Sequence, residues 1–475
     1  MESPRSAGVE RLEMASHQLR EDARRNRERI LKAAGRVLAH SPSASFEDIA
    51  TAAGVSRSTI YRHFPSRDSL IAASGEQPRT GTVDVEGLIA SGGLGREGPV
   101  PLDPIHVLDL VAPSALPEQL VAEAQRLARR PLALYVVDID GSHLLRIAGP
   151  DRFPDQIEAP LAVGPELDPD GLELLAERLS RHPGLEAVPL SLRGRATGIL
   201  VTAGHPRQPL TELARQAAAA VALADRYTDA FARAQRRKHP KAAAEIQQSL
   251  LPPRIMGVTG GEVAGNVLPS YEVAGDWFDV IENADGIWLS IADGLGGSTP
   301  ATASSAVALG ALRASRRSDG TISEALMVMH RTLQEMPGPR AEMSAVIAHW
   351  DPATHELRLA NCGHVPPVIL RHSGVADRLR AAEGRGLGGR SRPTPAERNV
   401  QLEPGDRLLM VSDGVMVEGE GKAGLGLDGV IAAAMRSERR TAADTVRQVH
   451  RAVLEATDGE LGDDATAVCL AVANE

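Results

Sequence analysis

The sequence predicts a multidomain chain with an all-α bundle, a small α+β domain, a connecting helical segment and a larger α/β sandwich. Its 475 residues are too many for one core, since a domain usually holds about 100 to 200 residues. The composition changes from a charged, helix-forming start to a stretch rich in glycine and proline, and then to alternating strand and helix patterns. The last half contains short apolar runs that end in aspartates, and such runs suit strands buried in a sandwich.

Composition excludes several classes of protein. Hydrophobic residues make up 43% and charged residues 24%, which excludes global disorder. The formal net charge of -10 argues against a protein coated in nucleic acid. Two cysteines cannot form a disulfide framework, and the start of the chain has no apolar signal segment. The longest apolar run, residues 217–224, is far shorter than the roughly 20 residues of a membrane span, so we expect a soluble cytoplasmic protein without a membrane partner.

The changes in composition place four boundaries. We expect a helical bundle at residues 18–74, a flexible linker at 75–104, an α+β domain at 105–209, coupling helices at 210–251 and the sandwich at 252–475. Within the sandwich we expect helices at residues 300–316, 322–336 and 441–457.

The N-terminal bundle has the pattern of a helix-turn-helix. Ser45 can cap one helix, Gly54 suits the turn, and Ser56 can cap a second helix whose Ile60 faces inward. From His17 to Ser74, 10 basic minus 6 acidic residues give +4, so basic charge gathers where a phosphate backbone would be met. The side chains expected to face the DNA groove are Arg57, Ser58, Tyr61 and Arg62.

The text GVSRSTIYRHFPSRDSLI resembles the N-terminal domain of TetR-type transcriptional regulators. The resemblance implies double-stranded DNA as a partner. The alternative is a three-helix bundle used only for protein contact, because those regulators normally continue into a helical ligand and dimer domain, whereas a glycine-rich stretch follows here. Useful DNA specificity usually needs two half-sites held by a dimer.

The middle domain resembles a GAF sensory domain. Strand-like pairs near residues 132–147 and 190–203 flank a helical stretch at 171–181. The sensor ligand stays open, since no paired metal-ligand set is present, and we expect His143, His182 and His205 to be solvated loop residues.

The segment after residue 210 has apolar positions that step by four and three alternately, from Leu213 to Phe231. This pattern favours a helix that pairs two protomers into a homodimer; the alternative is one amphipathic helix lying on its own domain. A shorter helix, AAAEIQQSLL, then stops at Pro252.

Aspartates stand where apolar runs begin or end in the last domain. They occur in the stretches AGDWFDV, IADGLGG, SDGV and GDDATAV, and in two of these a glycine follows the carboxylate and permits close backbone approach. A single such aspartate is more often a turn former. The set consists of Asp276, Asp279, Asp293, Asp413, Asp463 and Asp464.

Carboxylates that converge at one end of a buried sheet raise each other's pKa unless cations compensate them. Convergence therefore predicts metal ions, and all-oxygen ligands favour Mn²⁺ or Mg²⁺ over zinc. Two such ions would let a bridging water lose its proton and attack phosphorus without a nucleophilic side chain.

From about residue 242 to 473 the ordered text EIQQSLLPP, AGDWFD, IADGLGG, NCGHVPP, SDGV and GDDATAVCLAV resembles the metal-dependent serine/threonine phosphatases (PPM, type 2C), in their SpoIIE branch. The resemblance implies catalytic aspartates Asp276 and Asp293 that bridge two metals, with the Gly294 carbonyl, Asp413 and Asp463 completing the site and Asp279 or Asp464 as possible further ligands. Leu295 departs from the family text, and no arginine is assigned to the substrate phosphate. We expect His364 to be structural.

The resemblance implies a signalling phosphatase whose substrate is a phosphorylated anti-sigma-factor antagonist. We expect the EIQQSLLPP helix to transmit the state of the sensor to the metal site. The competing hypothesis is a DNA-binding regulator whose C-terminal domain only binds a partner.

Overall fold

The computed structural model describes residues 29–34, 37, 46–55, 111–159, 162–180, 184–239, 241–268, 275–294, 299–338, 341–379, 386–393, 397–416, 425–459 and 461–474. The chain divides into two compact units, residues 1–100 and 101–475, and each is described by itself. The expected linker, His182 and the four groove-facing candidates Arg57, Ser58, Tyr61 and Arg62 lie outside the described residues.

In the first unit, α2 (Phe46–Ala53) is the first helix of the expected helix-turn-helix. Its Ile49 is fully buried and packs with Ile30 of the preceding helical segment. Gly54 follows with a φ of 64°, a conformation that favours glycine and ends the helix. Arg29 donates a hydrogen bond of 2.9 Å to the Ala53 carbonyl, which ties the two helical segments together.

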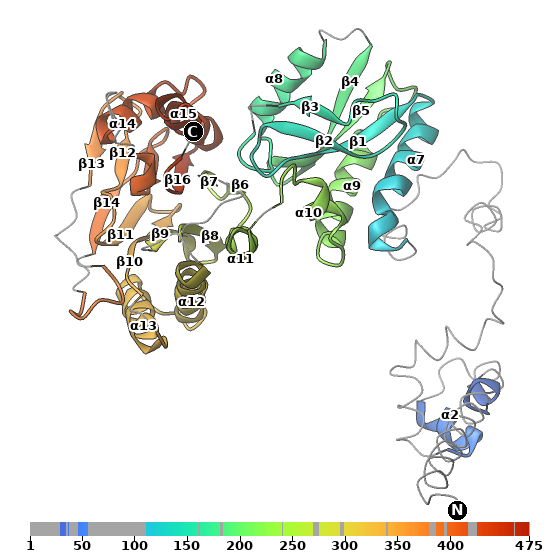
Figure 1. Ribbon diagram of the computed structural model, residues 1–475, viewed down its shortest axis with the longest axis horizontal. Helices are drawn as coiled ribbons and strands as arrows, with labels where there is room; N and C mark the ends of the chain where they lie inside the picture. Colours follow the sequence, from blue (N-terminus) through green and yellow to red (C-terminus); the bar gives the residue numbers. More distant parts are fainter. Residues whose placement is uncertain are drawn as a thin grey trace, which may run out of the picture. The chain divides into compact units, whose positions relative to one another are not determined.

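The second unit begins with an α+β domain built on one antiparallel sheet with strand order β3-β2-β1-β5-β4 (Figure 1). Apolar side chains of α7 and α9 pack on one face of this sheet, and those of α8 pack on the other. The elements are η1 (Pro113–Ala115), α7 (Leu116–Ala128), β1 (Leu132–Val137), β2 (His143–Ala148), β3 (Gln156–Glu158), α8 (Pro169–Ser180), β4 (Leu185–Leu192), β5 (Arg195–Ala203) and α9 (Thr211–Ala224).

Two expectations about this domain need correction. His143 lies within β2, half-buried and hydrogen-bonded to Ser142, instead of in a solvated loop; His205 is exposed as expected. The segment after residue 210 is not one continuous helix, because α9 ends at Ala224 and a separate helix, α10 (Ala230–Ala234), follows a polar turn. Most of its apolar positions, among them Ala217, Ala220 and Phe231, are buried against their own domain, as the amphipathic alternative requires.

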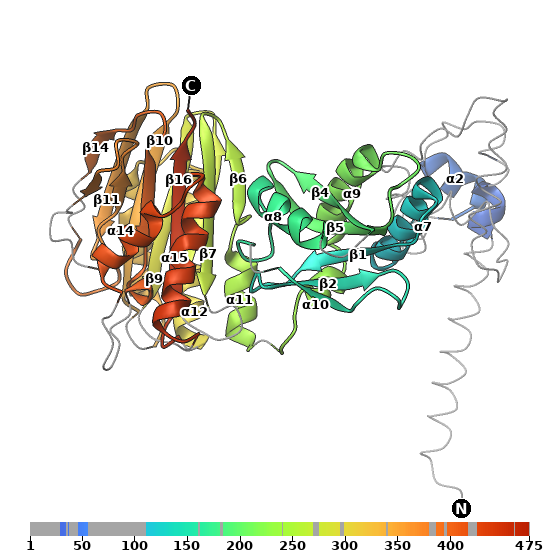
Figure 2. The same cartoon turned by 90° about the horizontal axis from the view of Figure 1, so that it is seen from above.

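The C-terminal domain is a sandwich of two antiparallel sheets, with strand orders β14-β11-β10-β9-β8 and β13-β12-β15-β16-β7-β6 (Figures 1 and 2). It is entered through α11 (Ala242–Leu250), the helix that the sequence predicts before Pro252. The strands are β6 (Ile255–Val258), β7 (Gly261–Leu268), β8 (Trp277–Asn283), β9 (Gly286–Gly294), β10 (Met343–Asp351), β11 (Glu356–Cys362), β12 (Val368–Leu370), β13 (Ala376–Arg378), β14 (Arg398–Gln401), β15 (Arg407–Val411) and β16 (Ala465–Val472).

Both sheets are apolar on both faces, since each also carries a helical layer. Along β16, Val468 and Leu470 enter the sandwich interior, while small residues such as Ala467 face the helices of their own sheet and let them approach closely. None of the helices in the described ranges combines the length and the apolar character needed to cross a bilayer. One sheet carries α12 (Thr299–Arg316) and α13 (Ile322–Glu335); the other carries η2 (Asp413–Val415), α14 (Leu427–Met435) and α15 (Ala442–Ala456).

Candidate metal centre

Four strand ends deliver carboxylates to one end of the sandwich. In the first sheet, Asp276 precedes β8 and Asp293 lies at the end of β9, and these two strands are antiparallel neighbours. In the second sheet, Asp413 follows β15 and Asp464 precedes β16, which are again antiparallel neighbours. Antiparallel pairing puts the end of one strand beside the start of the next, so each sheet contributes a pair of carboxylates at the same end.

Asp276 and Asp293 form the buried centre of this cluster. Asp276 is 2% exposed, and its Oδ2 accepts a hydrogen bond of 2.5 Å from the hydroxyl of Thr466. Its pKa lies well above the ordinary range, because of burial first and then the charges of Asp293 and Asp464. The pKa of Asp293 is raised to about 6, by burial and by the charges of Asp413 and Asp463. The carboxylates therefore lie close enough to oppose each other's ionisation.

Asp464 is the third buried carboxylate, and α11 contacts it directly. It is 1% exposed, and its pKa is raised to about 8, chiefly by burial and further by the charge of Asp463. Gln247 of α11 donates a hydrogen bond from Nε2 to Asp464 Oδ2 and a second one of 2.8 Å to the Asp276 carbonyl. The other oxygen of Asp464, Oδ1, is buried without a hydrogen-bond partner. A helix outside the sandwich thus holds one oxygen of this carboxylate and leaves the other open.

Asp413 and Asp463 lie at the exposed rim of the cluster. Asp413 begins the short helix η2, and Asp463 Oδ1 accepts a hydrogen bond of 2.8 Å from the Asp464 amide. No spacing in the sequence predicts His364 near this cluster, yet the charge of Asp413 acts on the pKa of His364, which burial lowers to about 4. His364 is 7% exposed and its Nε2 has no hydrogen-bond partner. The imidazole is therefore neutral and within electrostatic reach of the cluster.

Glycines beside the carboxylates let the backbone segments meet. A Cβ on Gly414 would lie 2.0 Å from the Asp464 carbonyl oxygen, and a Cβ on Gly275 would lie 2.5 Å from the Gly294 carbonyl oxygen. No real side chain tolerates such contacts. The close approach places the Gly294 carbonyl against the segment that carries Asp276.

The residues fit divalent cations by their chemistry. Within the described ranges, no arginine, lysine or histidine forms an ion pair with Asp276, Asp293, Asp413, Asp463 or Asp464. The same ranges contain no ready-made shell of three metal-ligating side chains. Buried carboxylates with raised pKa values and an open oxygen at Asp464 nevertheless need positive charge, and an all-oxygen donor set suits Mn²⁺ or Mg²⁺.

Asp279 is bound elsewhere. It lies on β8 with 3% exposure, and its two oxygens accept hydrogen bonds of 2.8 Å each from Arg313 and Arg316 of α12. The structure therefore does not bring Asp279 into the carboxylate cluster, and its charge is already compensated.

Sequence reasoning missed the polar residues that hold the carboxylates. Gln247, Ser412 and Thr466 are fully or almost fully buried. Thr466 donates a hydrogen bond to the Asp276 carboxylate, and Ser412 donates one to the Asp464 carbonyl and accepts one from the Thr466 amide. Their only signal in the sequence is position: Ser412 directly precedes Asp413 and Thr466 follows Asp464 by two, on the same side of the pleat as the interior residues Met410 and Val468. Gln247 stands in a helix whose contacts no spacing rule predicts.

Comparison with known families decides what kind of domain carries this cluster. Residues 283–473 match the family described as "Stage II sporulation protein E (SpoIIE)". The C-terminal domain is a SpoIIE-type phosphatase domain. Residues 30–74 match the family described as "Bacterial regulatory proteins, tetR family", so the N-terminal unit is a TetR-type helix-turn-helix domain.

Individual relatives match one domain or the other. Over 232 residues the chain is 23% identical to the phosphoserine phosphatase RsbU of Bacillus subtilis, covering 48% of this chain and 68% of RsbU. Over 61 residues it is 49% identical to the HTH-type transcriptional repressor LfrR of Mycolicibacterium smegmatis, covering 13% of this chain and 32% of LfrR. A solved structure of the RsbU and RsbW domains of Rv1364c from Mycobacterium tuberculosis aligns at a TM-score of 0.40 with 23% identity, covering 45% of this chain and 60% of that one.

Proposed function

We propose that the chain is a metal-dependent phosphoserine and phosphothreonine protein phosphatase in a signalling system. The main support is the cluster of carboxylates in the SpoIIE-type domain that raise each other's pKa. In this cluster Asp464 has one buried oxygen without a hydrogen-bond partner. We propose Asp276, Asp293, Asp413, Asp463 and the Gly294 carbonyl as ligands of two Mn²⁺ or Mg²⁺ ions, with Asp464 as a further ligand. When bound, these ions supply Lewis-acid activation of water and neutralise charge on the phosphoryl oxygens.

The chain's own residues prepare the site. The Thr466 hydroxyl holds one oxygen of Asp276, and Gln247 holds one oxygen of Asp464. These hydrogen bonds stabilise the ionised forms of carboxylates that burial would otherwise keep protonated. His364, buried and neutral within electrostatic reach of Asp413, has an open Nε2 that can accept a hydrogen bond.

The proposed substrate is a phosphorylated protein, and within that class an anti-sigma-factor antagonist. RsbU is named a phosphoserine phosphatase, and the match to it spans 232 residues of this chain. We further propose that α11 transmits the state of the middle domain to the metal site, because the same helix follows that domain in the chain and hydrogen-bonds Asp464.

Hydrolysis of a phosphoserine peptide by the purified full chain, titrated with Mn²⁺ and with Mg²⁺, tests this function. We expect turnover that depends on the ion and is lost in Asp293→Asn. Binding of a phosphoprotein without any turnover at any ion concentration would instead favour the competing hypothesis of a regulator with a binding-only C-terminal domain.

We also propose that the N-terminal domain binds double-stranded DNA through Arg57, Ser58, Tyr61 and Arg62. The match to the tetR family over residues 30–74 supports this role. Affinity for duplex DNA should fall steeply with salt, and Arg57→Ala and Arg62→Ala should each reduce the slope of that dependence by about one. If no binding occurs at low salt, the domain is a protein-contact module.

For the middle domain we propose a GAF-like sensor with an unidentified ligand, on the strength of its single antiparallel sheet with helices on both faces. A homodimer stays a prediction. Most of the apolar positions after residue 210 are used inside the domain, but Leu223 and Tyr227 are 58% and 79% exposed and remain available for pairing. Sedimentation of the full chain and of a Leu223→Glu variant tests this prediction.

A further inference from the structure

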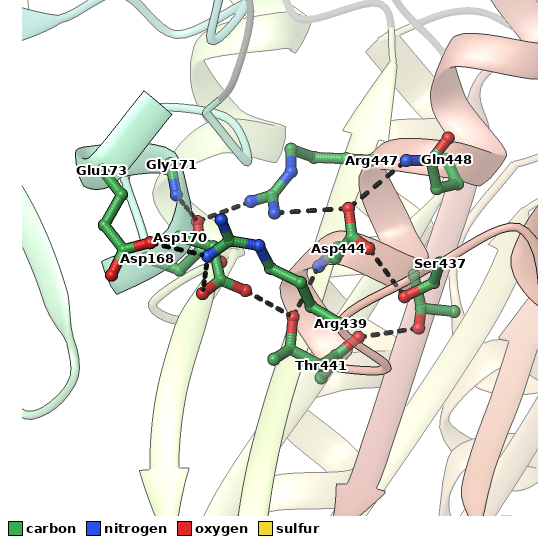
Figure 3. A network of polar contacts seen from close by, with 12 residues as sticks. Asp168, Asp170, Gly171, Glu173, Ser437, Arg439, Thr441, Asp444, Arg447 and Gln448 are labelled. Carbon is green, nitrogen blue, oxygen red and sulfur yellow. Dashed lines mark hydrogen bonds and ion pairs between the residues drawn. The ribbon is translucent and has the colours of Figure 1, made fainter. Parts of the chain in front are cut away.

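An acidic segment of the middle domain contacts helix α15 of the phosphatase domain and the residues just before it (Figure 3). Asp168 stands just before α8, and its Oδ1 accepts a hydrogen bond of 3.0 Å from the Gly171 amide. The same oxygen accepts a hydrogen bond of 2.5 Å from Arg447 of α15. The side chains of Asp168 and Arg447 are only 2% and 7% exposed. This is a buried ion pair between two domains. Removing Arg447 leaves the charge of Asp168 without a cation, whereas Arg447 keeps a second, longer contact of 3.5 Å with Asp444 of its own helix.

Further contacts surround this ion pair. Arg439, before α15, donates to Asp170 at 2.7 Å and to Glu173 at 3.0 Å. Thr441, the N-cap of α15, donates to the other oxygen of Asp170 at 3.4 Å (Figure 3). Glu166 accepts a hydrogen bond of 2.8 Å from the amide of Ile255 in β6. The acidic residues of one short segment thus meet the N-terminal half of α15 and the edge strand β6, with opposite charges facing each other.

From Arg447 a chain of contacts reaches the carboxylate cluster. α15 packs on β16 and β7 through Val446, Val449 and neighbouring apolar residues. His450, three residues after Arg447 on α15, is buried, and the apolar residues on either side of it pack in one cluster with Ala465 and Ala467 of β16. Ala465 is the first residue of β16 and directly follows Asp464. Because α15 packs directly on this part of β16, a displacement of α15 would shift the backbone next to Asp464.

We propose that the Asp168–Arg447 pair is a docking contact through which the middle domain holds α15, and with it the start of β16, in the position that Asp464 needs for binding metal. The proposal rests on the proposed metal site and adds a second route to it. The first route, α11, reaches Asp464 from the other side through Gln247. A ligand or partner that favours the undocked middle domain would therefore weaken metal binding.

The experiment compares Asp168→Asn, Arg447→Gln and the double variant in the full chain. Arg451→Gln is the matched control, because Arg451 lies one turn later on the same helix, is exposed, and has no ion pair within the described residues. Two readouts are taken without substrate: hydrogen exchange of peptides covering residues 461–472 in the metal-free protein, and Mn²⁺ affinity by calorimetry.

Each single variant should speed exchange at the start of β16 and weaken Mn²⁺ binding by at least about fivefold, the lower end of typical couplings between sites. The double variant should be no worse than the stronger single variant, since both act on one contact. Arg447→Lys keeps the positive charge and should retain part of the coupling. It keeps the proposal testable if Arg447→Gln does not fold.

The proposal is overturned if folded single variants match Arg451→Gln in both readouts, or if their effects add in the double variant. The experiment also distinguishes a failure of this proposal from a failure of the proposed function. If the single variants speed hydrogen exchange and weaken Mn²⁺ binding in a chain that hydrolyses no phosphopeptide, the docking contact is supported and the phosphatase activity is contradicted.

Discussion

Gln247 of α11 donates a hydrogen bond to the carboxylate of Asp464, 217 residues later in the chain. The same amide nitrogen holds the Asp276 carbonyl, so one side chain of the connecting helix fixes two of the segments that carry metal-site residues. The helix that leads from the middle domain into the sandwich therefore supports the carboxylate cluster directly.

Gln247→Ala should lower phosphatase activity by about 10- to 100-fold, as loss of a residue that orients a metal ligand commonly does. The half-saturating Mn²⁺ concentration should rise at the same time, because Asp464 loses the hydrogen bond that favours its ionised form. Ser249→Ala on the same helix is the control, since its hydroxyl bonds only its own helix at the Ile246 carbonyl. Equal activity of the two variants would contradict a role for α11 in supporting the metal site.

The metal-free protein should become less stable as pH rises from about 4 to about 8. Folding raises the pKa of Asp293 to about 6 and that of Asp464 to about 8, whereas an unfolded aspartate titrates near about 4. The folded state therefore holds protons that the unfolded state has released, and its stability falls with pH across that window. Excess Mn²⁺ should reverse the trend, because the ion competes with protons for the same oxygens.

Thermal unfolding in EDTA and in Mn²⁺, from pH 5 to pH 8.5, measures this dependence, with Asp464→Asn as the reference for other titrating groups. In EDTA, the melting temperature of the variant should fall less steeply with pH, and Mn²⁺ should raise it less than in the native chain. An identical pH profile for the two proteins in EDTA would mean that Asp464 ionises normally.

Asp279→Asn should destabilise the domain by about 3 kcal/mol, the low end for a broken buried ion pair, because it leaves Arg313 and Arg316 without their buried partner. The half-saturating Mn²⁺ concentration should stay unchanged, since Asp279 lies outside the cluster. Chemical unfolding and an activity titration with Mn²⁺ separate the two effects. A shift in the Mn²⁺ requirement comparable to that of Asp413→Asn would make Asp279 a ligand after all.

Gly414→Ala should abolish activity and destabilise the domain, because its Cβ would meet the Asp464 carbonyl oxygen at 2.0 Å. Gly310→Ala is the matched change. Gly310 lies inside α12 with open space around its Cβ, so alanine there should stabilise the helix by about 0.5 to 1 kcal/mol. The two melting temperatures, with Mn²⁺-dependent activity, test the close approach; an active, stable Gly414→Ala protein would contradict it.

Much of the architecture follows from local pattern. The predicted helices near residues 300–316, 322–336 and 441–457 correspond to α12, α13 and α15 within one or two residues, because caps such as Thr321 and Thr441 and the apolar periodicity agree. Strand-terminal aspartates could likewise be assigned to one end of the sandwich, since antiparallel neighbours bring strand ends together.

What the pattern could not predict depends on tertiary contacts. The apolar positions around Ala217 and Ala220 fit a coiled coil and a domain face equally well, and the sheet of their own domain buries them. Asp279 has the same local text as a metal ligand, but the two arginines that neutralise it are more than 30 residues away. Gln247 and His364 gain their places beside the carboxylates only when distant segments meet.

The most direct test of the metal cluster is Mn²⁺ binding by calorimetry, run alongside phosphoserine-peptide hydrolysis, in the full chain and in Asp293→Asn. We expect the native chain to bind two ions per molecule and to hydrolyse the peptide in proportion to occupancy, and the folded variant to lose at least one ion and nearly all turnover. Native affinity and turnover in Asp293→Asn would contradict the account.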